Sequence, residues 1–436
     1  MKGKTRVGIG VFVLLLVLAG CGKKQVPVED YVRSNPPTLG MNGIMKSDTG
    51  YYYSTATAGE LSLHYYDVES GQNIYLCSKP ECRHDGDAFC TATSDKYNVK
   101  GACFYGDSLY LDVLETTDTE YLFKLLKVSA DGSELSEVTT YLSVNKTSVD
   151  VMLGGEQMII HRGVAVLPYL FIDMAQTRAT GKITGTMGTC LYHLETGELT
   201  ELPELKYGEK NNGRERFTGY GDYIYFNTQQ DRKNTLSRYC LKDGIVEDLE
   251  LLRTYTGLYE VMDEDTIYYY YSGNRLFEHK ISTKENSTHE GVFLNKNVYY
   301  NPVLNENFEK LEDYTCTDMV TDGTYLYAGK GVSFHKMSTG YLGTRVYADG
   351  VEQRIPSYVH VYDRDLNEVV RVEVNAEPYS GNIERFSLAI LEDMVYMQTA
   401  STVYACTLEE FLMGGQPPFQ PLYNHEGVEY SAYYGQ

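Results

Sequence analysis

Four residues that can bind a metal lie close together near the start of the chain: Cys77, Cys82, His84 and Cys90. Their spacing is C-x4-C-x-H-x5-C. Zinc binds four nitrogen or sulfur ligands in a tetrahedron, and thiolates and imidazoles supply such ligands. Because the protein would fill all four positions, this zinc site would be structural and would leave no position for a substrate. The spacing differs from the common C-x2-C knuckle, so it does not establish metal binding by itself.

Two other states of the same cysteines remain open. Exported proteins meet conditions that permit disulfides, and Cys103 supplies a fourth neighbouring cysteine, so two bridges could form in any of three pairings. In that state His84 is an ordinary loop residue. The thiols could also stay free and reactive, although the sequence marks no third group that would orient a nucleophile. The remaining cysteines fall within strand patterns, where we expect buried thiols: Cys190, Cys240, Cys316 and Cys406.

The N-terminus has the features of an export signal. A basic start, MKGKTR, precedes an apolar run over residues 7–19, which is shorter than the roughly 20 residues of a transmembrane helix. The run ends in Leu18-Ala19-Gly20-Cys21, which resembles the lipobox of bacterial lipoproteins. That resemblance implies removal of residues 1–20 and acylation of Cys21, with palmitate-type chains as the membrane anchor. We therefore predict a lipoprotein on the extracytoplasmic face of the cell membrane.

The net charge of the chain disfavours some classes of binding partner. The formal net charge is −22, and the predicted signal peptide carries basic residues that processing would remove. Such a surface repels the phosphates of nucleic acids and of anionic lipids. We therefore expect no nucleic-acid partner, and we expect the acyl chains rather than a basic patch to hold the protein at the membrane.

Composition and repeats predict an all-β fold. The chain has 41 tyrosines, 14 phenylalanines and no tryptophan, and tyrosine favours half-buried strands. A turn containing glycine or acidic residues leads into a short aromatic strand seven times, at a mean spacing of about 57 residues. The instances begin at Asp48, Gly106, Gly155, Gly221, Glu264, Gly323 and Glu392. The pattern favours a β-propeller of about seven four-stranded blades, with six or eight as alternatives and a pair of β-sandwiches as the competing architecture.

This interpretation divides the chain into three parts. Residues 1–20 are the signal peptide, residues 21–44 are the lipidated cysteine and a polar, proline-containing flexible tether, and residues 45–436 are the propeller domain. Two insertions, at about residues 163–188 and 341–357, are predicted to decorate one face of the propeller.

One longer motif supports the location. Leu76 to His84 reads LCSKPECRH, with Cys90 following, and a tyrosine-rich strand with a YD…G turn precedes it. This resembles a motif, L-C-x-K-P-x-C-x-H then Cys, of uncharacterised lipoproteins from Gram-positive anaerobic bacteria. The resemblance implies a TolB-like β-propeller on the outer face of the membrane. It implies no chemistry, because the activity of that group is not established.

No sequence pattern identifies an active site. P-loop, dinucleotide-binding, zinc-protease and nucleophile-elbow motifs do not occur in the sequence. We therefore expect a binding or scaffolding module for a peptide, a protein or a glycan. The alternative is a secreted propeller hydrolase or lyase that acts on glycans or peptides. Acidic candidates for that alternative, Glu309, Glu312 and Asp313, are predicted to lie in a long solvated loop. The histidines of the strand patterns are predicted to be structural.

Overall fold

The computed structural model describes Arg33 and most of residues 44–424. The residues outside it are 1–32, 34–43, 48, 58–59, 68, 85–89, 95, 148, 152–157, 209–212, 252–256, 271–274, 291–293, 302–305, 314–315, 317, 331–342, 347–351, 356, 375–385, 392, 400–401 and 425–436. The predicted signal peptide, Cys21 and most of the predicted tether therefore lie outside the described residues.

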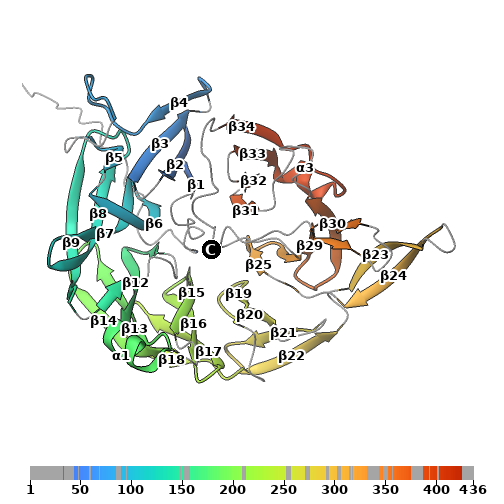
Figure 1. The fold of residues 1–436 in the computed structure, drawn as a ribbon. Helices are drawn as coiled ribbons and strands as arrows, with labels where there is room; N and C mark the ends of the chain where they lie inside the picture. Colours follow the sequence, from blue (N-terminus) through green and yellow to red (C-terminus); the bar gives the residue numbers. More distant parts are fainter. Residues whose placement is uncertain are drawn as a thin grey trace, which may run out of the picture.

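The described strands form a seven-bladed β-propeller, as Figure 1 shows in a view onto the ring. Each blade is an antiparallel sheet whose strands follow one another in the sequence from the centre of the ring to its rim. The prediction of about seven four-stranded blades is thus confirmed, and the alternatives of six or eight blades are excluded.

The blades follow the order of the chain. Blade one contains β1 (Ile44–Ser47), β2 (Gly50–Thr57), β3 (Glu60–Asp67), β4 (Gln72–Tyr75) and β5 (Thr93–Ser94), and blade two contains β6 (Tyr97–Tyr105), β7 (Ser108–Thr116), β8 (Glu120–Ser129) and β9 (Leu135–Asn145). Blade three contains β10 (Val149–Val151), β11 (Ile159–His161), β12 (Val164–Asp173), β13 (Gly185–His193) and β14 (Leu199–Tyr207), and blade four contains β15 (Gly213–Tyr220), β16 (Tyr223–Gln230), β17 (Lys233–Cys240) and β18 (Val246–Asp248). Blade five contains β19 (Tyr259–Val261), β20 (Thr266–Tyr270), β21 (Arg275–Lys280) and β22 (Glu285–Glu290). Blade six contains β25 (Asp318–Thr321), β26 (Leu326–Lys330), β29 (Ser357–Tyr362) and β30 (Glu368–Val374), and blade seven contains β31 (Phe386–Leu391), β32 (Met394–Thr399), β33 (Thr402–Thr407) and β34 (Gln420–Asn424).

The repeated turn joins the first two strands of a blade. Gly106 and Gly221 have φ values of 63° and 55°, a left-handed conformation that glycine adopts without steric cost. In blade three the predicted turn at Gly155 lies outside the described residues. The turn that connects β11 to β12 is formed by Arg162 and Gly163, whose φ values are 47° and 78°.

Tyrosine packs the core between the blades. The three tyrosines of β20 are all buried, and they alternate between the two faces of blade five. Tyr268 and Tyr270 pack toward blade six, and Tyr269 packs toward blade four. This is the period-two pattern of a strand that is buried on both faces.

Three excursions leave the ring. The β12–β13 hairpin of blade three carries the short helix α1 (Met174–Thr180), within the first predicted insertion. A hairpin of β27 (Gly343–Val346) and β28 (Glu352–Ile355) lies within the second. A further hairpin, β23 (Leu294–Asn301) and β24 (Glu306–Asp313), extends outward between blades five and six (Figure 1). The predicted long loop around Glu309 is therefore wrong, because those acidic residues belong to β24.

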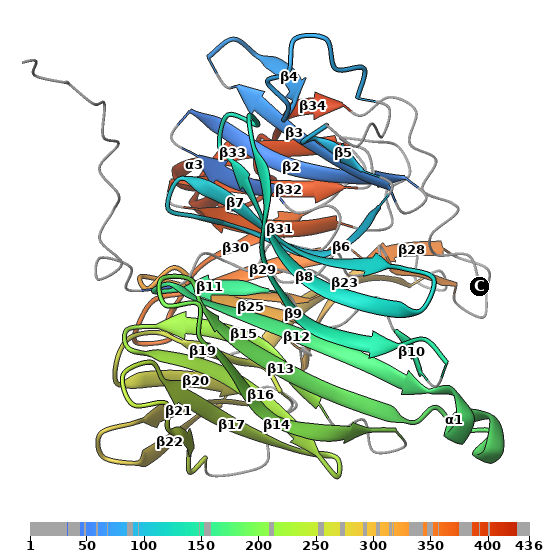
Figure 2. The ribbon, with the colours of Figure 1, turned by 90° about the vertical axis from the view of Figure 1, so that its left-hand side faces the viewer.

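Side chains, rather than a shared strand, close the described ring. All described strands of blade one come from one end of the chain and those of blade seven from the other (Figure 2). At the seam between them the rings of Tyr51 and Tyr396 meet edge to face at 5.0 Å, and their hydroxyl groups share a hydrogen bond. The described helices are α1 and α3 (Leu408–Leu412), and neither is long and apolar enough to cross a membrane.

Candidate metal centre

The outer strand of blade one is interrupted by the segment that carries the cysteines. On β3, the main chain of Leu63 accepts a hydrogen bond from Leu76 at the end of β4 and donates one to Ala92 just before β5. The two short strands therefore continue one another along the edge of β3. Residues 77–91, of which 85–89 lie outside the described residues, connect these two strands, and we call this segment the rim excursion. All four candidate ligands belong to it.

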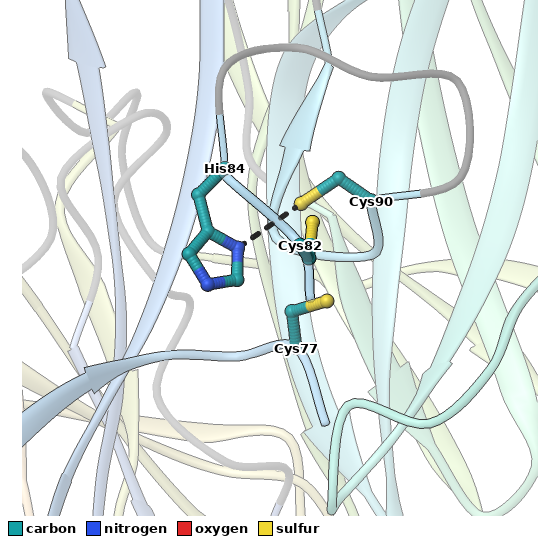
Figure 3. Close-up of side chains that lie close together, drawn as sticks. All are labelled: Cys77, Cys82, His84 and Cys90. Atoms are coloured by element: carbon teal, nitrogen blue, oxygen red, sulfur yellow. Dashed lines mark hydrogen bonds between the residues drawn. The ribbon is translucent and has the colours of Figure 1, made fainter. Parts of the chain in front are cut away.

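The four candidate ligand atoms converge at the base of the rim excursion. One sulfur or nitrogen atom from each of Cys77, Cys82, His84 and Cys90 lies within 4.8 Å of every other (Figure 3). Nδ1 of His84 is 3.5 Å from Sγ of Cys90. His84 has a left-handed backbone with φ of 55°, an uncommon conformation for a non-glycine residue that turns its ring toward the sulfur atoms. Cys90 is buried and the other three are half-buried.

Main-chain N–H groups point at the sulfur atoms. The N–H of Thr93 donates to Sγ of Cys90 at 3.3 Å. Burial raises the pKa of the Cys77 thiol, but hydrogen bonds from Thr91, from the Lys79 backbone and from Cys82 outweigh it and lower the pKa to about 7. Donors of this kind stabilise a thiolate, which is the form of cysteine that binds a metal.

The pKa of Cys82 moves in the opposite direction. The backbone N–H of His84 favours its thiolate, but partial burial and the adjacent Cys90 and Cys77 outweigh that bond and raise the pKa to about 11. The first thiolate therefore forms on Cys77, and its negative charge makes a second thiolate on Cys82 harder to form. A bound cation would offset that repulsion and favour the second thiolate.

Blade two contacts both ends of the rim excursion. The β8–β9 turn places the carbonyl of Gly132 where it accepts hydrogen bonds from the Ser78 N–H and the Thr91 hydroxyl. The same hydroxyl donates to the carbonyl of Leu76 at 2.9 Å, which ties the two ends of the excursion together. Gly132 has φ of 66°, and a Cβ atom there would lie 2.5 Å from the carbonyl carbon of Leu76. Only glycine fits this approach without displacing the chain around Cys77.

Aromatic rings hold His84 from the side of blade one. Its imidazole stacks on Tyr75 with a centroid distance of 4.5 Å and an interplanar angle of 20°. Tyr75 in turn contacts the ring of His64, which stacks on the buried Tyr53. The stack therefore runs from the blade core to the candidate ligand. Sequence analysis did not identify these supporting rings, because cross-strand pairs depend on register.

The other cysteines lie apart from the centre. Cys103 is buried on β6 in the apolar cluster between blades two and three, and burial raises the pKa of its thiol to about 12. Cys190, Cys316 and Cys406 are also buried in the core, whereas Cys240 is half-buried. All eight described cysteines are free thiols in this structure.

The described histidines of the strand patterns make local contacts. His161 in β11 is buried, and its Nε2 is 2.7 Å from the carbonyl of Gly221. His279 contacts Asn286, and Nδ1 of His360 lies 2.7 Å from the Glu368 carboxylate. His335 lies outside the described residues.

The sequence analysis did not predict two buried clusters of charged residues. Between blades two and three, Lys100 bonds to Asp112 at 2.9 Å and to the Tyr141 hydroxyl at 3.1 Å. Near the ring centre, Arg216 bonds to Asp318 at 2.8 Å and to Glu260 at 3.2 Å. Lys100 and Arg216 each lie at a bulge of an innermost strand, where the register shifts. A bulge can turn a side chain out of the pattern of its strand, and no sequence signal marked either one.

Comparisons with known proteins identify no family for this chain. No protein-family model matches the chain, and no curated protein matches it in sequence. A prolyl endopeptidase, from a study of two such enzymes and their inter-domain dynamics, is 13% identical with a TM-score of 0.46. The match covers 91% of this chain but 51% of that one, so this chain spans about half the length of the endopeptidase. An oligogalacturonate lyase from Vibrio parahaemolyticus is 12% identical with a TM-score of 0.46, over 86% of this chain and 91% of the lyase.

Proposed function

We propose that this protein is a lipid-anchored extracytoplasmic β-propeller that acts as a binding or scaffolding module, and that its rim excursion holds a structural zinc ion. The observation that carries the proposal is the convergence of three sulfur atoms and one imidazole nitrogen within 4.8 Å. This is the number and type of ligands that structural zinc sites use. The predicted export signal and the resemblance of Leu18 to Cys21 to a lipobox support the proposed location.

The hydrogen bonds around the sulfur atoms favour a metal over disulfides. Each of the three cysteines accepts a main-chain N–H bond, the arrangement that stabilises thiolates. A second bridge would need Cys103, whose side chain is packed in the apolar cluster between blades two and three. With a metal, Nδ1 of His84 is the nitrogen that faces the sulfur atoms, and Tyr75 fixes the plane of the ring.

A four-ligand site supports a structural role. Zinc in this site would have no open position for water or substrate, so it would contribute stability rather than Lewis-acid chemistry. It would close the 15 residues of the rim excursion, residues 77–91, and fix them to blade two through Gly132. A rigid propeller with loops fixed in this way suits the recognition of a peptide, a protein or a glycan.

The metal can be tested by counting zinc and free thiols on one anaerobically purified sample of the mature chain. We expect about one zinc per chain and, after chelation and unfolding, eight titratable thiols besides Cys21. Cys82→Ser should lose the zinc, whereas Cys240→Ser, a half-buried cysteine of blade four, should keep it. A protein without zinc and with four fewer titratable thiols would contain two disulfides, and the proposal of a metal centre would be wrong.

The anchor and the binding role need separate experiments. Metabolic labelling with palmitate should label the wild-type protein and not Cys21→Ser, and the unlabelled variant should leave the membrane fraction. A purified wild-type protein incubated with peptide and glycan libraries should retain ligands without changing them. Cleavage of any library member, at a rate proportional to protein concentration, would contradict the binding role and favour the alternative of a hydrolase or lyase.

A further inference from the structure

Arg33 is held at one face of the ring, far in sequence from the residues that hold it. Its guanidinium donates to the main-chain carbonyls of Val261, at 2.5 Å, and Met262, at 3.2 Å. It also lies 5.0 Å from the centre of the Tyr220 ring, and Arg33 and Tyr220 form an isolated antiparallel bridge. These partners stand at the ends of β15 and β19, the innermost strands of blades four and five.

The surroundings of Arg33 suit a guanidinium group. The aromatic face and the two carbonyls satisfy a delocalised cation and its N–H donors. Burial lowers the pKa of Arg33, and the nearby charges of Glu260, Asp322 and Asp263 act against that effect. One carboxylate, that of Asp263, is also within 3.2 Å of Arg364.

A second arginine lies close to one of the same carboxylates. Arg216 extends across the innermost strands of blades four, five and six to reach Glu260 and Asp318, both of which are buried. Glu260 also attracts Arg33, and cations near a buried carboxylate offset the cost of its burial.

We propose that the ends of β15 and β19 form an arginine-binding site, and that its ligand is Arg33 of the chain's own N-terminal segment. The site docks the predicted tether onto the face of the propeller where the first and second strands of each blade are joined. If Cys21 is lipidated, a consequence that rests on the proposed function, the 12 residues from Cys21 to Arg33 span at most about 40 Å. That face would then lie toward the membrane.

Trypsin tests the docking, because the protease must take the Arg33 side chain into its own specificity pocket. We expect Tyr220→Leu to increase the initial rate of cleavage at Arg33–Ser34 about fivefold. Loss of a cation–π contact of ordinary strength should raise the population of undocked Arg33 by about this factor. The matched control is Tyr223→Leu in the same turn, because Tyr223 lies against Arg238 at 4.1 Å instead. Equal cleavage of wild type and Tyr220→Leu would overturn the proposal, and so would an equal increase in both variants.

A peptide in trans tests the recognition itself. A fluorescent peptide of residues 28–38, VEDYVRSNPPT, should bind the full-length mature Arg33→Ala protein and should bind the wild-type protein at least tenfold more weakly. The same peptide with Arg33→Ala should bind neither. Absence of binding to the Arg33→Ala protein, or equal binding to both proteins, would overturn the proposal. Neither result depends on zinc, so this test can fail while the metal centre stands.

Discussion

Gly132→Ala tests whether blade two positions the candidate metal ligands. An alanine Cβ at this position would lie 2.5 Å and 2.6 Å from the carbonyl carbon and oxygen of Leu76 and 2.7 Å from the nitrogen of Cys77. These are main-chain atoms, so a rotamer change cannot relieve the contact. The left-handed backbone costs an alanine about 1–2 kcal/mol, and overpacking of this kind adds about 1–3 kcal/mol.

Gly106→Ala is the matched control for this experiment. Gly106 has nearly the same φ, 63° against 66°, in another turn of the same blade, but a Cβ there meets no atom within 4 Å. We therefore expect Gly106→Ala to destabilise blade two by about 1–2 kcal/mol and Gly132→Ala by about 2–5 kcal/mol. Only Gly132→Ala displaces Cys77.

Zinc affinity is the decisive readout. Perturbing the groups that support metal ligands typically lowers affinity by about 10–100-fold, so competition with a chromophoric chelator should show a loss of that size for Gly132→Ala and none for Gly106→Ala. Denaturant unfolding of the same samples gives the stability difference. Equal zinc affinities in the two variants would refute the idea that the β8–β9 turn holds the site in place.

Three further predictions concern Cys77, Lys100 and His161. In the metal-free protein, alkylation of Cys77 by iodoacetamide, followed by peptide mass spectrometry, should rise with pH around its pKa of about 7, and zinc should suppress it. Lys100→Met should lower the free energy of unfolding by about 3–5 kcal/mol because it leaves Asp112 buried without its cation, and adding Asp112→Leu should recover most of the loss. Burial lowers the pKa of His161 from 6.5 to about 4, so its protonation favours the unfolded chain. The free energy of unfolding should therefore fall as pH decreases from about 6.5 to about 4. His161→Gln should make the free energy of unfolding, measured by denaturant titration at each pH, depend less on pH over this range than in the wild-type protein.

The sequence predicted what depends on local pattern. Turn residues followed by alternating aromatic strands are local signals, so the propeller and its seven blades could be recognised before the structure was known. The cysteine and histidine spacing likewise identified the set of residues that converge. The turn between β11 and β12, formed by Arg162 and Gly163, was not predicted, because Gly155 offered a similar sequence pattern just before β11.

What the sequence could not predict depends on contacts between distant segments. Gly132 lies some fifty residues from the cysteines it supports, and nothing in its own neighbourhood distinguishes it from other turn glycines. Arg33 lies in a polar, proline-containing stretch typical of a tether, and its partner Val261 is 228 residues away. Such contacts appear only when the segments that carry them have packed against one another in the folded chain.

The position of the candidate metal centre can be related to how the described part of the ring is closed. Blade one packs on blade two through a broad apolar cluster that includes Leu76 and Cys90, whereas the described buried residues at its seam with blade seven are Tyr51, Tyr53, Tyr396 and Ala405. Blade one is therefore held more firmly on one side. A metal bound in the rim excursion would strengthen the firm side, because the excursion is hydrogen-bonded to Gly132, and it would join the two halves of the blade's outer strand. Removal of the metal should then loosen the outer strand first and leave blade one able to separate at the tyrosine seam, because no main-chain pairing crosses it in the described part of the ring.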